Sequence, residues 1–576
     1  MLNRIVIPAI ALLLLLSSCT KTATDIKADT VYQNGNIWTV DKDQPNAEAI
    51  AIAEGKIIGV GSFESLQNFI GDSTELVDLK GKFMMPGFIE GHGHFVGFGN
   101  SLLKLNFLDS KSWDEIVQMV ASAAVDLPKG AWIEGRGWHQ EKWTEGELVK
   151  DVMGYPFHDG LSALTPDNPV ILRHASGHSL YANEAAMRLA GVSKETADPP
   201  GGEIVRDANG EAIGVFEERA MALITAAFED YRSQLSEDEI KGEWLKAVET
   251  AEYGCLKNGV TSFQDAGTYF NDMEGFIERA NTGKMRVRLY SMLRHSAEEM
   301  APVLDDYPYI GLGDDFFTCR AIKTEVDGAL GAFGAWLLRP YNDKKGFHGQ
   351  NTTTLAEVSK IADLARDHGM QLCVHAIGDR ANQEVLNIME ERFSNLEDKD
   401  WRWRIEHAQH LDTADIPRFR EMGIIASMQG IHCTSDSPFV EDRLGEERSR
   451  LGAYPWRSLL DNGVIIANGT DAPVEKISPI DCFYASVTRK RADTGFAFYP
   501  EQRMSREEAV YSYTLGNAFA AFEEDIKGSI EVGKYADLVI LSNDLINCAD
   551  ESILNTKILS TIVNGELVYS SEEDQG

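Results

Sequence analysis

The stretch "PGFIEGHGHF", residues 86–95, places His92 and His94 one residue apart, immediately after an apolar run. If that run is a β-strand, side chains two residues apart point to the same face, so the two imidazoles converge on one point. Converging imidazoles are typical ligands of a divalent metal ion. A single pair is weak evidence, because histidine also serves as a hydrogen-bonded residue of the core or surface. Further ligands must come from downstream.

Residues that can bind a metal recur at the ends of four later apolar runs. In chain order they are Lys323 with Glu325 and Asp327 on one predicted strand face, His375, His407 and Asp471. Four histidines, a lysine and several acids at comparable places in successive segments exceed what core packing alone is expected to produce. The segments therefore need a fold that brings their ends together.

The spacing of apolar segments predicts that fold. Strand-like segments followed by helical ones occur at 83–92, 259–264, 286–292, 318–325, 371–375, 402–407, 424–428 and 464–469. Eight β/α units are typical of an α/β protein with a TIM-type (β/α)8 barrel, which keeps its chemistry at the carboxyl ends of the strands. All the candidate ligands lie at those ends.

Short alternating strands with Asn-Gly and Glu-Gly turns occupy both ends of the chain. We expect residues 29–82 and 528–571 to form one β-sandwich domain, and residues 83–527 to form the barrel. Residues 105–230 are too many for one crossover after the first strand and contain the strand-like segments "AWIEGRGW" and "PVILRHASGHS". They are predicted to be an insertion over the active site.

The motifs resemble the amidohydrolase superfamily, in particular its YtcJ-like branch, also called amidohydrolase family 3. The matching segments are "MMPGFIEGHGHF", "ASGHSLYANEAAM", "PPGGEIVRDANGEAIGVFEE", "GVTSFQDAG", "IKTEVDGALG", "VHAIGDRAN", "RIEHAQ" and "NGTDAPVE". The resemblance covers nearly the whole chain after the N-terminal segment. It implies a metal-dependent barrel joined to a β-sandwich made from both termini.

The resemblance also implies a ligand set. His92 and His94 would hold a first metal ion together with Asp471, while His375 and His407 would serve a second ion or complete a mononuclear site. Imidazole and carboxylate ligands suit zinc, and iron and manganese accept them as well. One or two ions fit this pattern.

Lys323 matches the position at which binuclear members carry a lysine carboxylated by carbon dioxide, which turns a cation into a bridging anion. A metal lowers the pKa of bound water from about 15.7 towards about 7. Asp471 would act as general base by taking the proton of this water, and then as general acid by passing it to the leaving nitrogen. Glu90 stands where the family more often has Asp, which leaves the ligands untouched.

Three weaker candidates for contact with the substrate lie near these motifs. His178 belongs to the predicted insertion, and Gln429 and His432 follow the seventh strand. An ordinary surface histidine is the alternative for His178, and a structural role is the alternative for the other two.

The sequence therefore predicts a metal-dependent hydrolase of non-peptide amide or related C–N bonds in a small substrate. A deaminase or cyclic-amide hydrolase on the same barrel is an alternative, although no glutamate directly follows His375, near where mononuclear deaminases generally keep one. A lipid-anchored binding protein without turnover is the non-enzymatic alternative. The presence of every expected ligand argues against it.

Composition limits the partners. The chain has 576 residues, 43% of them hydrophobic, and a formal net charge of −36. Nucleic-acid binding is not expected, because neutralising phosphates requires clustered Lys and Arg and no basic run is present. The sequence does not indicate an oligomeric state.

The N-terminus "MLNRIVIPAIALLLLLSSCT" has a basic residue and an apolar stretch too short to span a bilayer comfortably. Its end, Leu16-Ser17-Ser18-Cys19, resembles a bacterial lipobox, in which the cysteine is lipidated. We expect residues 1–19 to be a lipoprotein signal with its cysteine, and residues 20–28 to be a tether. Thr20 after the cysteine predicts an exported protein anchored in the outer membrane of a Gram-negative bacterium, facing the periplasm. The six other cysteines form no CxxC pair and are expected to be buried free thiols.

Overall fold

The computed structural model describes residues 26–107, 110–140, 143, 150–174, 179–393 and 400–572. The predicted signal, Cys19, most of the tether and His178 lie outside these ranges. Within them, no helix is both long enough and apolar enough to cross a membrane. The six cysteines from Cys255 to Cys548 are all free, and five of them are buried, as expected.

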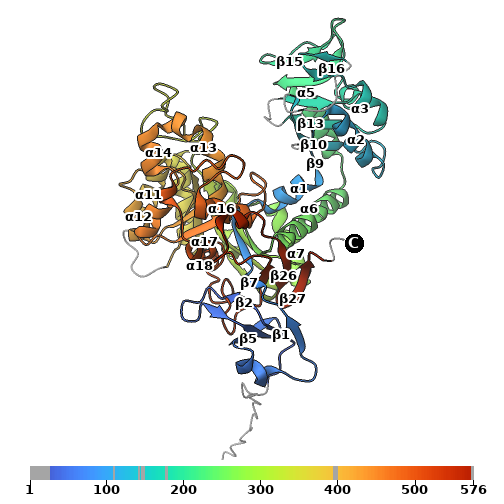
Figure 1. Cartoon of the computed structure of the whole chain (residues 1–576). Helices are drawn as coiled ribbons and strands as arrows, with labels where there is room; N and C mark the ends of the chain where they lie inside the picture. The colour runs from blue at the N-terminus through green and yellow to red at the C-terminus, as the bar shows by residue number, and fades with distance from the viewer. Residues whose placement is uncertain are drawn as a thin grey trace, which may run out of the picture.

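Eight parallel strands form a nearly closed barrel, so the predicted (β/α)8 architecture is confirmed (Figure 1). They are β8 (Phe88–Gly93), β17 (Val260–Thr268), β18 (Arg288–Leu293), β20 (Phe317–Glu325), β21 (Gln371–Ala376), β22 (Arg404–His407), β23 (Ile425–Gln429) and β24 (Ile466–Gly469). The last strand returns to the first. There, the Asp471 backbone N–H donates to the His92 carbonyl oxygen at 2.8 Å.

Helices between the strands surround the barrel. They include α6 (Glu237–Lys257), α7 (Phe270–Asn281), α10 (Leu355–Asp367), α11 (Asp379–Phe393), α12 (Ile416–Met422), α13 (Gly430–Leu444) and α16 (Pro479–Thr488). Helix α10 is amphipathic: Val358, Ile361, Ala362 and Ala365 recur at helical spacing and are buried. Thr354 caps its first turn by accepting the Glu357 N–H.

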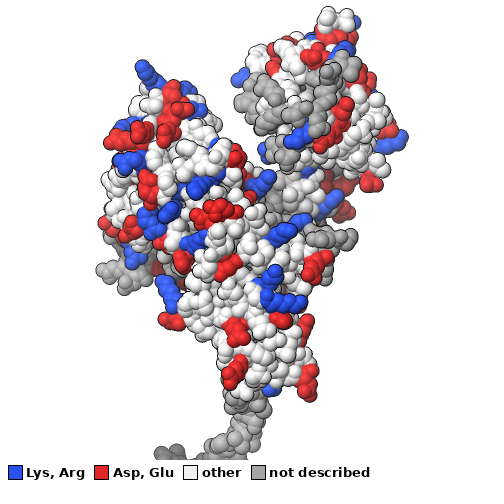
Figure 2. All heavy atoms as spheres, viewed as in Figure 1, with Lys and Arg blue, Asp and Glu red and all other residues white. Residues whose placement is uncertain are grey.

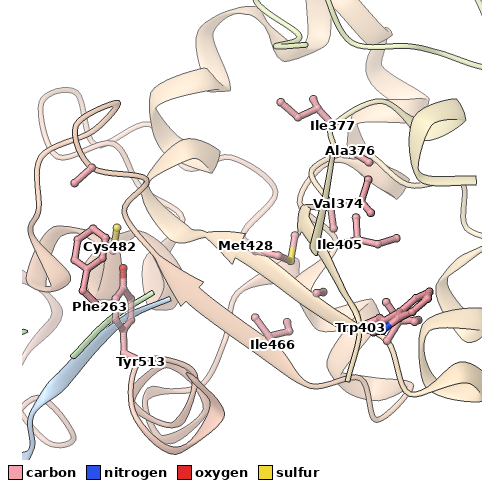
Figure 3. Close-up of a cluster of buried hydrophobic side chains, with 14 of the residues drawn as sticks. Phe263, Val374, Ala376, Ile377, Trp403, Ile405, Met428, Ile466, Cys482 and Tyr513 are labelled. Carbon is pink, nitrogen blue, oxygen red and sulfur yellow. The ribbon is translucent and has the colours of Figure 1, made fainter. Parts of the chain in front are cut away.

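Side chains alternate between the helical shell and the barrel interior along each strand. Val374, Ile405 and Met428 come from three adjacent strands and belong to the large buried cluster beneath the helices (Figure 3). Their inward-facing neighbours are different in character: Cys373 joins a small interior apolar cluster, and His375 lines the cavity above it. The apolar outer layer therefore fixes the orientation of the polar residues inside.

Both ends of the chain build two sheets at the base of the barrel (Figure 1). One contains β1 (Thr30–Gln33), β4 (Ala49–Ala53), β5 (Lys56–Gly61) and β6 (Glu75–Asp78). The other contains β2 (Asn36–Trp38), β3 (Asn46–Ala47), β7 (Phe83–Pro86), β25 (Leu538–Leu541), β26 (Ile558–Val563) and β27 (Glu566–Ser570). One apolar cluster joins residues of both sheets, including Ile52 and Leu538. The predicted strand 83–92 is in fact two strands, because β7 pairs with β25 and β8 pairs with β17.

Residues 105–230 form a separate α/β unit with its own six-stranded sheet and apolar clusters. The sheet consists of β9 (Leu105–Asn106), β10 (Ile133–Trp138), β13 (Val170–His174), β14 (Ser179–Ala182), β15 (Gly202–Arg206) and β16 (Ala212–Glu218). Helices α2 (Trp113–Ala124), α3 (Asp159–Leu164), α4 (Glu184–Leu189) and α5 (Met221–Ser233) accompany it. The unit extends from the barrel beyond α1 (Phe95–Leu103) and α6 (Figures 1 and 2).

That this insertion lies over the active site stays a prediction. None of its described residues lines the cavity at the carboxyl ends of the strands, and a wide gap separates the two parts in the space-filling view (Figure 2). The connection through α1 and α6 is tight. A Cβ added at Gly99 in α1 would lie 1.9 Å from the Ala247 carbonyl oxygen in α6, so only glycine allows this approach.

Candidate metal centre and active site

Four predicted ligands meet at the carboxyl end of the barrel. The possible ligand atoms of His92, His407 and Asp471 all lie within 4.8 Å of one another. Asp471 Oδ1 is 3.3 Å from His94 Nε2 and 3.7 Å from His92 Nε2. One carboxylate oxygen therefore faces both histidines of the opening motif.

The remaining two predicted ligands adjoin this cluster. The His375 and His407 rings lie 4.4 Å apart between centroids, and Lys323 lines the same cavity. Lys323 is 3% exposed, and its Nζ has a single weak contact, 3.5 Å from the Ala266 carbonyl oxygen. All six predicted ligands are thus brought together by the fold.

Unusual backbone conformations aim two of these side chains. His407 has φ 73° and Asp471 has φ 58°, a left-handed region that non-glycine residues seldom occupy. In β22 the alternation already turns Glu406 inward, so a regular strand would turn His407 outward. The left-handed conformation instead lets consecutive residues reach the site. Local strain of this kind clusters at functional sites.

The electrostatics of the cluster favour metal ligation. Burial lowers the pKa of His92 to about 4 and of His375 to about 3, and it also lowers the pKa of His407. These imidazoles are therefore neutral near pH 7, as ligands must be. Burial alone would raise the pKa of Asp471, but His94 and His92 lower it overall, so Asp471 is anionic.

The donor set fits a divalent cation. Among the described residues, the buried nitrogens His92 Nε2 and His375 Nε2 have no hydrogen-bond partner. Leaving buried polar atoms unpaired costs free energy, and such atoms call for an explanation. A metal ion held by imidazoles and the Asp471 carboxylate would satisfy them with the ligand types that zinc, iron and manganese accept.

A cavity of about 380 Å³ opens above these residues. The six predicted ligands form its floor, together with Gln409 and His432, and apolar residues such as Phe439 form part of its wall. This volume is at the small end of the range for ligand sites. A second pocket, of about 470 Å³ between β2 and the barrel, is lined by apolar side chains such as Trp38 and Ile466 and contains none of the predicted ligands.

The sequence matches the amidohydrolase family over residues 75–569, which is most of the chain. The protein belongs to the amidohydrolase family. The resemblance read from the motifs is confirmed, and the protein is a hydrolase acting on carbon–nitrogen bonds.

Two curated relatives align with this amidohydrolase over almost their whole length. Amidohydrolase YtcJ of Bacillus subtilis (strain 168) is 33% identical over 550 residues, 94% of this chain and 99% of the relative. N-substituted formamide deformylase of Arthrobacter pascens is 28% identical over 561 residues, 94% of this chain and 98% of the relative. An uncharacterized metal-dependent hydrolase from Pyrococcus horikoshii OT3 has the same fold, with a TM-score of 0.71 at 24% identity over 90% of this chain and 99% of that structure.

A buried ion pair that the sequence did not single out orients His92 in the amidohydrolase. Glu406 Oε2 lies 2.5 Å from His92 Nδ1, and Arg404 Nε donates to Glu406 Oε1 at 2.7 Å. Burial would raise the pKa of Glu406, but Arg404 and His92 lower it, so the carboxylate is charged. A carboxylate behind a ligating histidine fixes its tautomer and raises its basicity, and here it leaves Nε2 free to face the cluster.

Glu90 joins the first and last barrel strands beneath the cluster. It accepts hydrogen bonds from the Thr470 backbone N–H at 2.5 Å and from the Thr470 hydroxyl at 2.9 Å. A Cβ added at Gly469 would lie 2.4 Å from Glu90 Oε1 and 2.6 Å from the His92 backbone nitrogen, so only glycine fits there. Glu90 thus holds the segment that presents Asp471.

The three residues predicted to share a face of β20 separate in the structure. Lys323 and Glu325 line the cavity, but Glu325 forms an ion pair with Arg294. Asp327 lies beyond the end of the strand, where its oxygens accept backbone N–H groups of Ile377, Gly378 and Trp336 at 2.8–2.9 Å. The period of two does not extend past the strand, and Asp327 fixes the turn after β21.

The two described candidates for substrate contact take different places. Gln429 does not line the cavity; its Oε1 lies 2.7 Å from His407 Nδ1, so it orients that ring from behind. His432 does line the cavity, with Nε2 4.0 Å from Asp471 Oδ2. Gln409 Nε2 donates to His432 Nδ1 at 3.1 Å, which assigns the ring hydrogen to Nε2 on the cavity side.

Proposed function

We propose that this amidohydrolase cleaves the C–N bond of a small non-peptide amide, with a formamide as the first class to test. The convergence of neutral buried imidazoles with the anionic Asp471 on the floor of a small cavity carries the proposal. The similarity to N-substituted formamide deformylase supports the substrate class.

The protein side chains would divide the chemistry between binding and proton transfer. His92, His94 and Asp471, with His375 and His407 beside them, would hold a divalent metal, which when bound would supply Lewis acidity and lower the pKa of water. Asp471 takes the proton of the attacking water and carries it to the leaving nitrogen, because its free oxygen faces the cavity.

His432 would assist at the carbonyl oxygen. Its Nε2 faces the same space as Asp471, and Gln409 fixes the tautomer that can donate a hydrogen bond there. A donor held in place before the reaction stabilises the negative charge that develops on the carbonyl oxygen. Lys323, buried and without an ion-pair partner among the described residues, is the site where carbon dioxide could add to form a bridging carbamate.

The deaminase alternative lacks an acid in the required place. After His375 the first acid in the chain is Asp379, and its Oδ1 accepts the backbone N–H groups of Leu338 and Arg380 at 2.8 and 2.9 Å. Asp379 does not line the cavity. Amide hydrolysis, in which Asp471 alone moves the proton, is therefore favoured over deamination.

Metal analysis combined with a substrate screen tests the proposal. Purified protein should contain one or two equivalents of a transition metal and release amine from N-substituted formamides, N-acyl amino acids or cyclic amides. Chelation should abolish turnover, and readdition of zinc, iron or manganese should restore it. Turnover that persists after complete removal of metal, or deamination without any amide hydrolysis, would contradict the proposal.

A further inference from the structure

The outer wall of the active-site cavity carries two carboxylates that the proposed chemistry does not use. They are Asp436 on α13 and Glu475 in the loop after β24, and both line the cavity. Asp436 lies one helical turn beyond His432, and Glu475 follows Asp471 by four residues. Both carboxylates therefore border the space into which a substrate would extend away from the cluster.

Asp436 has one strong partner and one open oxygen. The Tyr454 hydroxyl donates to its Oδ2 at 2.5 Å, while no donor among the described residues reaches Oδ1. Burial raises the pKa of Asp436; His432 and the Tyr454 hydroxyl oppose the rise, and the negative charge of Glu475 adds to it, so the two carboxylates are near enough to repel each other. A cation between them would relieve that repulsion.

Glu475 has no hydrogen bond or ion pair with any described residue. The nearby basic residue Arg294 does not neutralise the pair, because it is already bound to Glu325 across the cavity. Lys323 lies beside the histidines, where burial lowers the pKa of its ammonium group. Among the described residues, neither Asp436 nor Glu475 therefore forms an ion pair with a lysine or an arginine.

A second feature marks the space beside this wall as the place of a ligand. His432 is 7% exposed, and among the described residues its Nε2 has no hydrogen-bond partner although it faces the cavity. Apolar side chains lie on either side of this space, contributed by Leu330, Ile377, Phe439 and Val474. The cavity of about 380 Å³ is therefore lined by the polar cluster, by these apolar side chains and by the two carboxylates.

We propose that the substrate is a small amide with an apolar or aromatic body and a positively charged group, such as a protonated amine, at the end remote from the scissile bond. Asp436 and Glu475 bind that charge, and the apolar wall holds the body. This inference rests on the proposed amide hydrolysis and specifies its substrate. Opposite charges a few ångströms apart in a partly dehydrated cavity interact far more strongly than in bulk water.

Three formamides of nearly equal size test the charge preference. They are N-[4-(aminomethyl)benzyl]formamide, which is cationic, N-(4-ethylbenzyl)formamide, which is neutral, and 4-(formamidomethyl)benzoate, which is anionic. For the metal-loaded wild-type enzyme we expect kcat/KM to be at least about tenfold higher for the cation than for the neutral compound, and lowest for the anion. The double variant Asp436→Asn, Glu475→Gln should reduce the cation-to-neutral ratio to near one.

Asp442→Asn is the matched control, because Asp442 lies on the same helix, is exposed and does not line the cavity. It should keep the wild-type ratio. Equal kcat/KM for cation and neutral compound in the wild type, or an unchanged ratio in the double variant, would overturn the inference while leaving amide hydrolysis intact.

If none of the three formamides is hydrolysed, the proposed function fails for formamides. Calorimetric binding of the same compounds then decides the preference: tighter binding of the cation supports it, and equal or weaker binding overturns it.

Discussion

Asp471 is expected both to bind the metal and to transfer protons, because the same carboxylate faces the histidines and the substrate cavity. We expect Asp471→Asn and His92→Ala each to lower kcat/KM by about 10²–10⁴-fold or more, since each removes a ligand or a proton carrier. The circular dichroism spectrum should not change, because little core volume is lost. Asp442→Asn and His368→Ala, outside the cavity, should retain activity. Near-wild-type turnover in either test variant would exclude the role assigned to that residue.

Lys323 is expected to be carboxylated. Burial lowers the pKa of its ammonium group, which favours the neutral amine that reacts with carbon dioxide. A carbamate bridging two ions predicts about two metal equivalents per chain and weak activity after reconstitution without bicarbonate. Lys323→Ala should be inactive and partly rescued by acetate or propionate. One metal per chain, no dependence on carbon dioxide and full activity in Lys323→Ala would refute the carbamate and leave Glu325 as the remaining anionic candidate on this strand.

Glu406 is expected to act as a positioning residue through His92. Glu406→Gln keeps the shape of the side chain but removes the charge behind the imidazole, so metal affinity should fall by about 10–100-fold. Competition with a chromophoric chelator measures this loss. Glu252→Gln is the control, because Glu252 is an equally buried carboxylate paired with Arg279 far from the cavity. If both variants lost stability alike and neither lost metal affinity, Glu406 would be only structural.

Site residues could be placed from the sequence where a regular strand carries them. His92, Lys323 and His375 lie on inward faces of strands or at their ends, and the period of two was enough to place them. His407 reaches the cluster only through its positive φ, which no periodicity encodes; its motif suggested it, but its geometry could not be foreseen. Glu406 was not predicted, because His407 was taken to be the residue of this strand that faces inward. Its signal was present: Arg404 and Glu406 alternate with the apolar Ile405.

At the scale of elements, Glu90 connects β8 to the end of β24 and so helps to close the barrel. Burial raises its pKa to about 8 from an ordinary value of 4.5, although the Thr470 hydrogen bonds partly offset the effect. The folded protein therefore binds a proton that the unfolded chain releases between pH 4.5 and 8. Glu90 contributes stability that is fully present below pH 4.5 and is lost as the pH rises through 8.

Substitution of Glu90 is expected to change the pH dependence of the unfolding free energy. In metal-free protein, Glu90→Gln should flatten the fall in unfolding free energy between pH 4.5 and 8, because glutamine mimics the protonated acid and can still accept the Thr470 N–H. Denaturant unfolding at several pH values checks this. Parallel wild-type and variant curves over that range would show that Glu90 does not titrate there.

All eight barrel strands were predictable as elements, because each is a short apolar run followed by a helical pattern. Their boundaries were less so. The segment 83–92 is mostly apolar, and nothing in its composition shows that β7 pairs with the C-terminal β25 while β8 begins the barrel. Pairing partners distant in sequence decide that division, and a local pattern does not contain them.

The chain as a whole is acidic. Acidic and basic side chains are interspersed over the visible face, without an extended basic patch (Figure 2). The prediction against nucleic-acid binding rests on this lack of clustered charge and on the net charge of −36.

The insertion was recognisable in the sequence by its length and its own strands. The direction in which it extends from the barrel was not, because the contact between α1 and α6 that sets this direction depends on small residues such as Gly99.

Attachment to a membrane is the prediction that concerns the molecule as a whole. Leu16-Ser17-Ser18-Cys19 matches a lipobox, and the chain between Cys19 and the first strand at Thr30 is short, so an acylated Cys19 would hold the β-sandwich close to the lipid surface. A single acyl chain gives only marginal binding, and stable anchoring needs the several chains of a mature lipoprotein.

In a Gram-negative host we expect the wild type in the outer-membrane fraction and in the detergent phase of a Triton X-114 partition. Cys19→Ala should remain unprocessed or appear in the aqueous phase, and Cys548→Ala, a half-buried thiol far along the chain, should partition as the wild type does. Mass spectrometry of the N-terminal peptide reads the modification directly. An unmodified Cys19 in a protein that partitions into water would overturn the anchor without affecting the proposed catalytic role of the barrel.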